Sequence, residues 1–218
     1  MERAQLFDGC ESAEVNCALV IAVALFSFAN AANAKLPREW QRARTLYFEG
    51  IGGNHAARED ADRLFTEMYR EDPNAPMIQV YYGSLRLLEA SSTWALWKKN
   101  SLCMEGIRLM DQAVSSQPES LEIRFVRAAT TYHLPSFFHR KEQAREDFAY
   151  LARVAVSAAH DGRLEPRLAA ASLYFNGELL NEAGCEEGAI ASWKSAISIA
   201  PESPAAQGAR EKLAEVKR

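Results

Sequence analysis

One spacing of residues recurs along the chain and constrains its fold more than any other feature. Its clearest copy lies near the C-terminus, where Ala189, Trp193, Ala196 and Pro201 are separated by three, two and four residues. The same spacing returns in Gly106–Met110–Ala113–Pro118, in Ala61–Phe65–Met68–Pro73 and, without a proline, in Ala144–Phe148–Leu151. Apolar positions three, four and seven residues apart share one side of an α-helix. The recurrence therefore predicts several similar helices.

Each position in this spacing has a physical reason. Small residues, such as Ala189 and Gly177 twelve residues before it, let the two helices of a hairpin approach closely. The large apolar residue fills the gap between consecutive hairpins. The proline ends the second helix because it has no backbone N–H to donate. The pattern thus predicts helical hairpins joined by short turns.

Repeated helix-turn-helix units of about 34 residues resemble the tetratricopeptide repeat (TPR) family. The last unit, about 170–203, matches best, through Gly177, Gly184, Ala189, Trp193, Ala196 and Pro201. The resemblance covers about 37–203 and implies an all-α fold. The expected domain is a right-handed stack of about four TPR-like units in 35–203, followed by a polar capping helix at 204–218.

Three of the four units depart from the regular pattern. The second has eleven residues too many between Gly83 and Gly106, and the third has four too many between Ala128 and Ala144. In the first, Glu49 stands where a small residue is expected, beside Gly50. The glycine-rich segment that follows, 50–53, is expected to form the turn between the first two helices.

An apolar run of 13 residues, 17–29, precedes the repeats and contains no charged residue. It is too short to span a bilayer, and Ala32-Asn33-Ala34 follows it as a cleavage site for a signal peptide. We therefore expect 1–34 to be a signal peptide, Lys35 to be the first mature residue, and the protein to be periplasmic or secreted. The alternative is an N-terminal apolar helix packed on the first repeat, in a cytoplasmic or membrane-tethered protein, and the acidic leading segment favours it.

Composition narrows the class of partner. The net charge of −4 argues against a nucleic-acid-binding protein, which would carry a basic excess. No Lys/Arg cluster of the kind that binds anionic membranes is present, and no stable membrane span is expected after processing. No catalytic or phosphate-binding motif of known mechanics occurs. We expect no enzymatic activity and no cofactor.

His133 and His139 form the most unusual local cluster, but two histidines do not make a zinc site. We expect Leu134-Pro135 to break the chain between two helices, while Phe137 and Phe138 anchor the loop in the core. No metal site is predicted.

Two pairs of residues have alternative interpretations. Cys103 and Cys185 fall in the second and fourth units, too far apart for a disulfide, so both are expected to be buried thiols. Trp94 and Trp97 lie in the insertion of the second unit. We expect them in the core, closing a long loop; exposed, they would form a sticky patch.

The resemblance also implies where a partner binds. In TPR stacks the first helix of each unit lines a concave groove that holds peptides. Carried over to this chain, the groove positions are Leu46, Met77, Val80, Ser84, Phe125, Ala129, Tyr132, Tyr174 and Glu178. The basic clamp by which some family members hold a peptide carboxylate is missing, because its positions include Leu46, Gly50, Tyr81 and Glu122. Phe125, Tyr132 and Tyr174 are the expected anchors.

Three functions fit this pattern. The first is an exported scaffold or adaptor that holds a protein or peptide partner in the groove. The second is a helical enzyme with its site among Glu122, Tyr132, His133 and Glu178, although no motif supports it. The third is a groove for a lipid or another small ligand, consistent with the aromatic lining.

Overall fold

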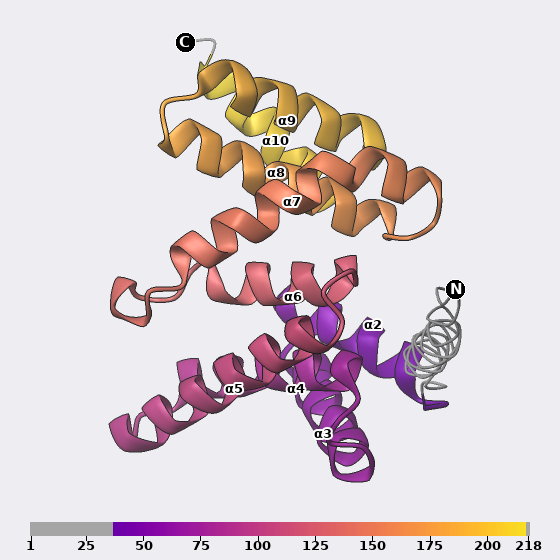
Figure 1. Ribbon diagram of the computed structural model, residues 1–218, viewed down its shortest axis with the longest axis vertical. Helices are drawn as coiled ribbons and strands as arrows, with labels where there is room; N and C mark the ends of the chain where they lie inside the picture. Colours follow the sequence, from indigo (N-terminus) through magenta and orange to yellow (C-terminus); the bar gives the residue numbers. More distant parts are fainter. Residues whose placement is uncertain (1–36, 217–218) are drawn as a thin grey trace, which may run out of the picture. The chain divides into compact units, whose positions relative to one another are not determined.

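A computed structural model describes residues 37–216, apart from the side chain of Leu96 (Figure 1). The chain divides into two compact units, Met1–Gln41 and Arg42–Arg218. The predicted signal segment, 1–34, lies outside the described residues, and the description below concerns the second unit. Within 37–216, no helix has both the length and the apolar character needed to cross a bilayer.

The prediction of an all-α fold is confirmed over the described residues. The helices are α2 (Trp40–Ile51), α3 (His55–Glu71), α4 (Pro76–Ser92), α5 (Leu96–Ser116), α6 (Leu121–Thr131), the short 3₁₀ helix η2 (Ser136–Phe138), α7 (Lys141–His160), α8 (Pro166–Glu182), α9 (Glu186–Ile199) and α10 (Pro204–Val216). Residues 50–53 include the turn between α2 and α3, as expected, and Gly53 has a φ of 106° that favours glycine.

The prolines of the recurring spacing end helices as predicted. α3, α5 and α9 each end two residues before their proline, at Pro73, Pro118 and Pro201. In all three cases the next helix begins three residues after that proline. At the last of these turns the Ser203 hydroxyl oxygen accepts a hydrogen bond from the Ala206 N–H at 3.1 Å, which caps α10. One turn design therefore recurs three times.

The apolar positions of the spacing form the core. All twelve are buried, in α3, α5, α7 and α9: Ala61, Phe65, Met68, Gly106, Met110, Ala113, Ala144, Phe148, Leu151, Ala189, Trp193 and Ala196. The large residue at the centre of each copy is completely inaccessible to solvent. The recurring spacing therefore marks the buried face of α3, α5, α7 and α9.

Close approach of helices explains the small residues. Gly83 in α4 and Gly106 in α5 face each other where the helices cross, and a Cβ on Gly83 would lie 2.8 Å from the Gly106 carbonyl oxygen. Gly177 in α8 lies against the Trp193 ring of α9, where a Cβ would overlap the indole. Both hairpins thus depend on glycine at the crossing point.

The eleven additional residues of the second unit lengthen its helices. Beyond the crossing, α4 continues four residues further than α8, and α5 begins seven residues earlier than α9. These lengths are close to one and two helical turns. Both hairpins keep a loop of three residues. In the third unit, by contrast, the additional residues lie in the loop that contains η2.

The hairpins contact one another in a regular order. α4 packs against α3, α5 and α6; α6 packs against α7 and α8; α8 packs against α9 and α10. α2 contacts α4 through Tyr47, whose ring lies 4.7 Å from the ring of Tyr81. α5 also packs against α6, and α7 packs against α8, so successive hairpins contact each other through both of their helices. α10 covers α8 and α9.

A buried ion-pair network links the middle hairpins. Asp147 in α7 is 1% exposed and accepts hydrogen bonds from Arg127 Nε and Nη2, each at 2.9 Å, and from Arg124 Nη1 at 2.7 Å. Arg127 also pairs with Asp111 of α5 at 3.3 Å, and Asp111 pairs with Arg140 at 2.8 Å. The network joins α5, α6 and α7.

Candidate binding surface

The predicted groove residues all fall on the even-numbered helices or directly after one. Leu46 is in α2, Met77, Val80 and Ser84 are in α4, Phe125 and Ala129 are in α6, Tyr132 follows α6, and Tyr174 and Glu178 are in α8. These residues differ in how far their side chains are exposed to solvent. Leu46, Met77, Ala129, Tyr132, Tyr174 and Glu178 are half-buried, whereas Val80, Ser84 and Phe125 are buried.

Two of the three buried residues, Ser84 and Phe125, connect helices. Ser84 Oγ lies 2.8 Å from the Tyr47 hydroxyl and 2.8 Å from Thr130 Oγ1, which connects α4 with α2 and α6. The Phe125 ring packs edge-on against Phe148 of its own hairpin, with 6.4 Å between centroids. The expectation that these side chains line an open groove is therefore revised, since a partner cannot reach them.

A closed polar network occupies the region nearest α2. The Glu122 carboxylate accepts hydrogen bonds from Arg44 Nε at 2.6 Å and from the Tyr81 hydroxyl at 2.5 Å. Arg44 Nη1 also pairs with Glu165 at 2.9 Å. Burial, and then the neighbouring Glu122, raise the pKa of Tyr81, so its hydroxyl stays a donor. These groups satisfy one another and connect α2, α4 and α6 to the start of α8.

The other end of the predicted groove is an aromatic surface formed by Tyr132, Phe175 and Tyr174. The Phe175 ring lies between the other two, with centroids 5.6 Å from Tyr132 and 5.4 Å from Tyr174. It also stacks on the buried Phe148 at 5.0 Å. All three rings are half-exposed, so α6 and α8 together present a continuous aromatic area that is anchored in the core.

Two carboxylates border the aromatic surface. Glu182 accepts a hydrogen bond from the Tyr132 hydroxyl at 3.1 Å and pairs with Lys141 at 2.8 Å. Glu178 pairs with Lys212 of α10 through Oε2 at 3.2 Å, while its Oε1 is buried and accepts no hydrogen bond from the described residues.

The electrostatics keep the phenols neutral and favour the charged form of Glu182. Burial raises the pKa of Tyr132 to about 12, and the hydrogen bond to Glu182 acts in the same direction. Burial and the nearby Glu178 carboxylate raise the pKa of Tyr174. The hydrogen bond from Lys141 lowers the pKa of Glu182. At neutral pH the surface therefore combines apolar rings, hydroxyl donors and two carboxylates.

Phe175 is the residue that sequence reasoning missed. It follows the predicted anchor Tyr174 directly and lies between Tyr132 and Tyr174, whereas the predicted anchor Phe125 is buried. The sequence Leu-Tyr-Phe at 173–175 could have indicated it, because consecutive residues of a helix point in directions about 100° apart, so the second ring extends the aromatic face. Arg44 was also missed, and no spacing pointed to its contact with Glu122, 78 residues away.

Several expectations about exposure were wrong. Trp94 and Trp97 are 86% and 75% exposed, because the insertion lengthens two helices and leaves no long loop for the indoles to close. Phe137 is exposed, and only Phe138 packs inward, against Ala90, Leu102 and Cys103. Cys103 is buried as predicted.

Cys185 is exposed, because it precedes α9 at a hairpin turn. Both thiols are free. Within 37–216 no group of three His, Cys, Asp or Glu side chains is placed to hold a metal ion.

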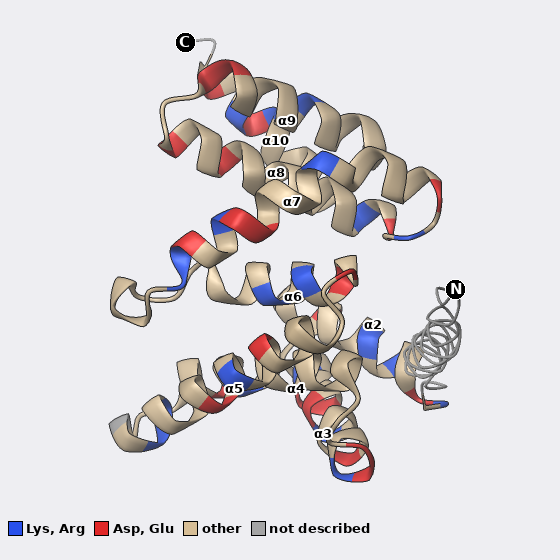
Figure 2. Cartoon of the chain, in the orientation of Figure 1, with Lys and Arg blue, Asp and Glu red and all other residues tan. Residues whose placement is uncertain are grey.

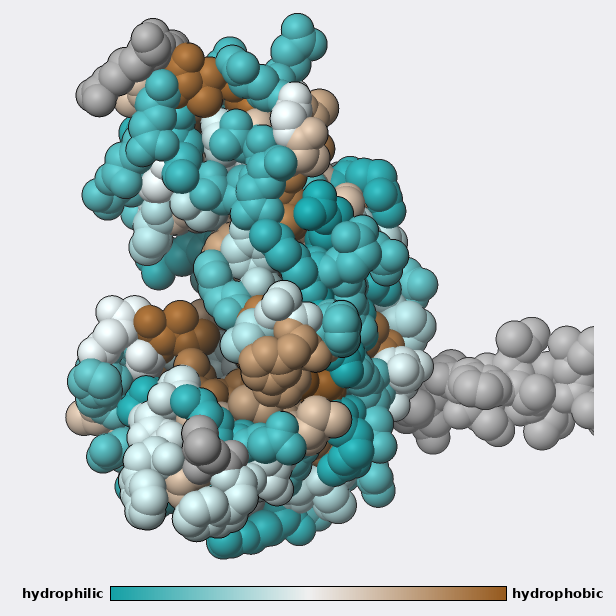
Figure 3. All heavy atoms as spheres, turned by 90° about the vertical axis from the view of Figure 1, so that its left-hand side faces the viewer, coloured by the Kyte–Doolittle hydropathy of each residue, from teal (hydrophilic) through white to brown (hydrophobic). Residues whose placement is uncertain are grey.

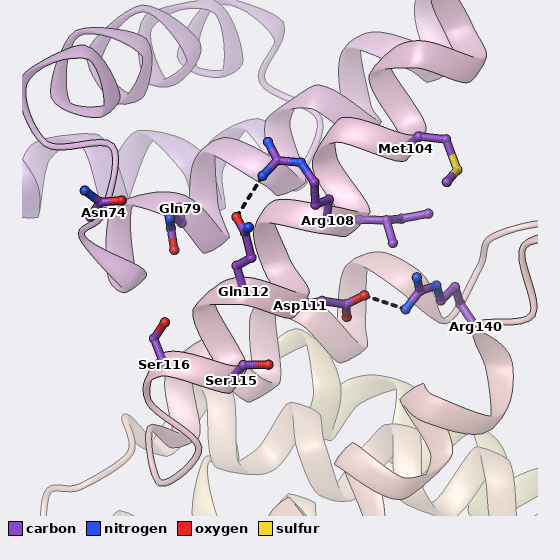
Figure 4. A pocket seen from close by; sticks show the side chains of 10 residues that line it. Asn74, Gln79, Met104, Arg108, Asp111, Gln112, Ser115, Ser116 and Arg140 are labelled. Atoms are coloured by element: carbon purple, nitrogen blue, oxygen red, sulfur yellow. Dashed lines mark hydrogen bonds and ion pairs between the residues drawn. The ribbon is translucent and has the colours of Figure 1, made fainter.

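A separate cavity of about 630 Å³ lies on the outer side of the second hairpin (Figure 4). It is lined by Asn74 and Gln79 from α4 and the turn before it, by residues of α5 and by Arg140. Its charged groups are already engaged: Arg140 pairs with Asp111, and Arg108 donates to Gln112 at 2.9 Å. Polar and apolar groups line the cavity about equally, so it does not fit the apolar groove that was considered for a lipid.

Comparison with family models, with curated proteins and with solved structures finds no significant match. The fold therefore defines the class only as an all-α protein built from helical hairpins, and the TPR resemblance stays a prediction.

Proposed function

We propose that this protein is a scaffold of the TPR type, in which right-handed stacking of four helical hairpins presents a binding surface for a protein or peptide partner. The recurrent buried positions, the shared turn design and the contacts between successive even-numbered helices support this arrangement. Helical hairpins that contact only their neighbours form extended surfaces suited to peptides.

The observation that carries the proposal is the aromatic surface of Tyr132, Phe175 and Tyr174. Half-exposed rings in edge contact, held by a buried ring beneath them, offer a large apolar area at little cost in conformational entropy. The exposed Glu182 carboxylate beside the rings adds an acceptor for N–H donors. The partner that fits is a segment with apolar or aromatic side chains next to a lysine or arginine.

A displayed peptide library tests the proposal. Peptides selected on the full chain should be enriched in an aromatic or aliphatic residue adjacent to a basic one. A Tyr132→Ala, Tyr174→Ala double variant should bind the selected peptides at least about tenfold more weakly, or about 1.4 kcal/mol, because the apolar contact area is lost. A Glu178→Gln, Glu182→Gln variant should weaken the peptides with a basic residue more than their uncharged analogues.

Tyr150→Ala provides the matched control. Tyr150 is a half-buried tyrosine of α7 that interacts with Arg124, Arg153 and Glu119, away from the aromatic surface. This variant should bind with unchanged affinity. Equal binding by the native chain and by a double variant with native melting behaviour would exclude the aromatic surface as the site.

A further inference from the structure

The tip of the α4–α5 hairpin, residues 93–99, carries two tryptophans that the proposed peptide-binding function does not use. Trp94 is in the loop, Trp97 is in the first turn of α5, and their rings meet edge-on with 6.1 Å between centroids. Both are far more exposed than is usual for large apolar side chains. An exposed aromatic pair of this kind marks an interaction site.

The local structure holds the indoles outward. Thr93 Oγ1 donates a hydrogen bond to the Glu89 carbonyl at 2.9 Å, and the Lys99 N–H donates to the Ala95 carbonyl at 2.9 Å. Ala95, between the two tryptophans, is buried. The lengthened helices carry this fixed loop to the end of the hairpin, at the lower left of Figure 1. The exposure is therefore built into the fold.

The α6–α7 loop extends the apolar area. Phe138 packs against Leu102 and Cys103 at the side of the hairpin, and Phe137 beside it is 68% exposed. Figure 3 faces this side, where apolar side chains drawn tan and brown reach the surface. The α6–α7 loop therefore lies along the hairpin that carries the two indoles.

The charged residues within 90–104 are both lysines, and Glu89 and Glu105 flank this segment. Residues 90–104 contain Lys98 and Lys99 and no aspartate or glutamate, and the remaining polar residues are Ser, Thr and Asn. Lys98 pairs with Glu89 at 3.0 Å, whereas Lys99 forms no ion pair with the described residues. In Figure 2 the lysines appear blue next to the tip. Because Lys98 and Arg86 neutralise the Glu89 carboxylate, the unpaired Lys99 is the charge that the segment presents to an anionic surface.

We propose that this tip inserts its indoles into the interface of a membrane containing anionic lipid. Tryptophan prefers the depth at which its ring meets acyl chains and its N–H meets headgroups, and lysines next to it are attracted to anionic lipid. Two lysines alone bind weakly, so the indoles and the charges act together. A protein partner fits less well, since binding hot spots lie at the centre of a broad packed patch and these rings are at the narrow end of a hairpin.

Tryptophan fluorescence tests this directly. The chain has four tryptophans, and the other two, Trp40 and Trp193, are buried. With vesicles of phosphatidylcholine and phosphatidylglycerol, lipids brominated on their acyl chains should quench the emission of the full chain. The double variant Lys98→Gln, Lys99→Gln should bind these vesicles about tenfold more weakly. Each lysine near an anionic surface contributes ~1 kcal/mol, and the contribution of Lys98 is reduced because it also pairs with Glu89. In Trp94→Phe, Trp97→Phe the emission that remains should not be quenched.

Val156→Ser, which removes an exposed apolar side chain of α7, is the control and should leave the quenching unchanged. Because quenching reports only on indoles in contact with lipid, it separates the tip from vesicle binding by any other part of the chain. Two results would overturn the proposal. The first is sedimentation with vesicles without quenching. The second is a blue shift that depends on protein concentration and needs no lipid, which would assign the tip to self-association.

Discussion

At the scale of single residues, Trp193 shows most clearly how one side chain organises a unit. Its ring is completely buried, lies against Gly177, and donates a hydrogen bond from Nε1 to the Tyr174 carbonyl at 3.3 Å. It therefore fixes the spacing between α8 and α9. The same carbonyl belongs to a residue of the aromatic surface, so packing in this hairpin also positions the proposed site.

Trp193→Ala should lower the free energy of unfolding by about 3–5 kcal/mol, because a large cavity replaces the indole. Urea unfolding followed by circular dichroism measures this loss. A loss below about 1 kcal/mol would show that the ring does not determine the packing of these helices.

Tyr47 gives a prediction about alkaline stability. Burial raises the pKa of its hydroxyl to about 12, above the ordinary value of 10.0. Its stabilising contribution is complete below the unfolded pKa and is lost as the pH rises toward the folded pKa. Between about pH 8 and about pH 11 the native chain should lose roughly 1.4 kcal/mol through this group.

Tyr47→Phe should remove that share of the alkaline loss, although it also removes the hydrogen bond to Ser84. Urea unfolding of both proteins at the two pH values gives the comparison. If the variant and the native chain lose the same free energy, Tyr47 is not the titrating group.

At the scale of elements, the hairpin α4–α5 shows that length can change by whole turns while the crossing point is kept. Gly83 and Gly106 still meet, although four and seven residues have been added beyond them. The close crossing of the two helices is therefore common to the α4–α5 and α8–α9 hairpins, whereas the length of the hairpin beyond the crossing differs between them. The close approach makes the glycines sensitive to any added atom.

Gly106→Ala should destabilise the protein by about 1–3 kcal/mol, because the Cβ would overlap Leu87 and the Gly83 carbonyl. This is the opposite of the gain that alanine gives over glycine in an open helix. Ser101→Ala, at an exposed position of the same helix, should change stability by less than about 0.5 kcal/mol. Thermal unfolding of the two variants and the native chain measures both effects. A Gly106→Ala protein as stable as the native chain would contradict the close crossing of α4 and α5.

The elements also show what sequence could and could not predict. The prolines and the buried positions were predictable because each follows from local spacing. The insertion in the second unit was not, since eleven residues fit equally well into a loop or into three helical turns. Phe125 and Tyr174 occupy equivalent positions, yet one is buried against Phe148 and the other leans on Gly208 of α10. Contacts with other helices decide this, Phe148 in the partner helix α7 for Phe125 and Gly208 in α10 for Tyr174, and spacing along one helix does not contain them.

At the scale of the whole described unit, the Asp147 network couples the hairpins. Asp147→Ala would leave Arg124 and Arg127 without their shared carboxylate, and removing one partner of a buried pair costs about 3–5 kcal/mol. Because α5, α6 and α7 meet at this network, its loss should also separate the unfolding of neighbouring hairpins.

Two probes measure this coupling. With Trp40, Trp94 and Trp97 replaced by phenylalanine, Trp193 emission reports on α8 and α9, and far-ultraviolet circular dichroism reports on all helices. In Asp147→Ala the two urea transitions should no longer coincide. Asp60→Ala, which removes an exposed pair with Arg63, should leave them coincident and cost less than about 1 kcal/mol. Coincident transitions in both variants would argue against coupling through Asp147.

The central claim, that the helical hairpins present a peptide-binding surface at Tyr132, Phe175 and Tyr174, is tested most directly by mapping amide chemical shifts. A peptide selected from a library is titrated into the isotopically labelled full chain. The account predicts that the largest shifts fall in 129–133 and 174–182 and spread to the start of α7 through Lys141. Shifts confined to the outer faces of α3, α5 and α7, or to the hairpin tip, would contradict it.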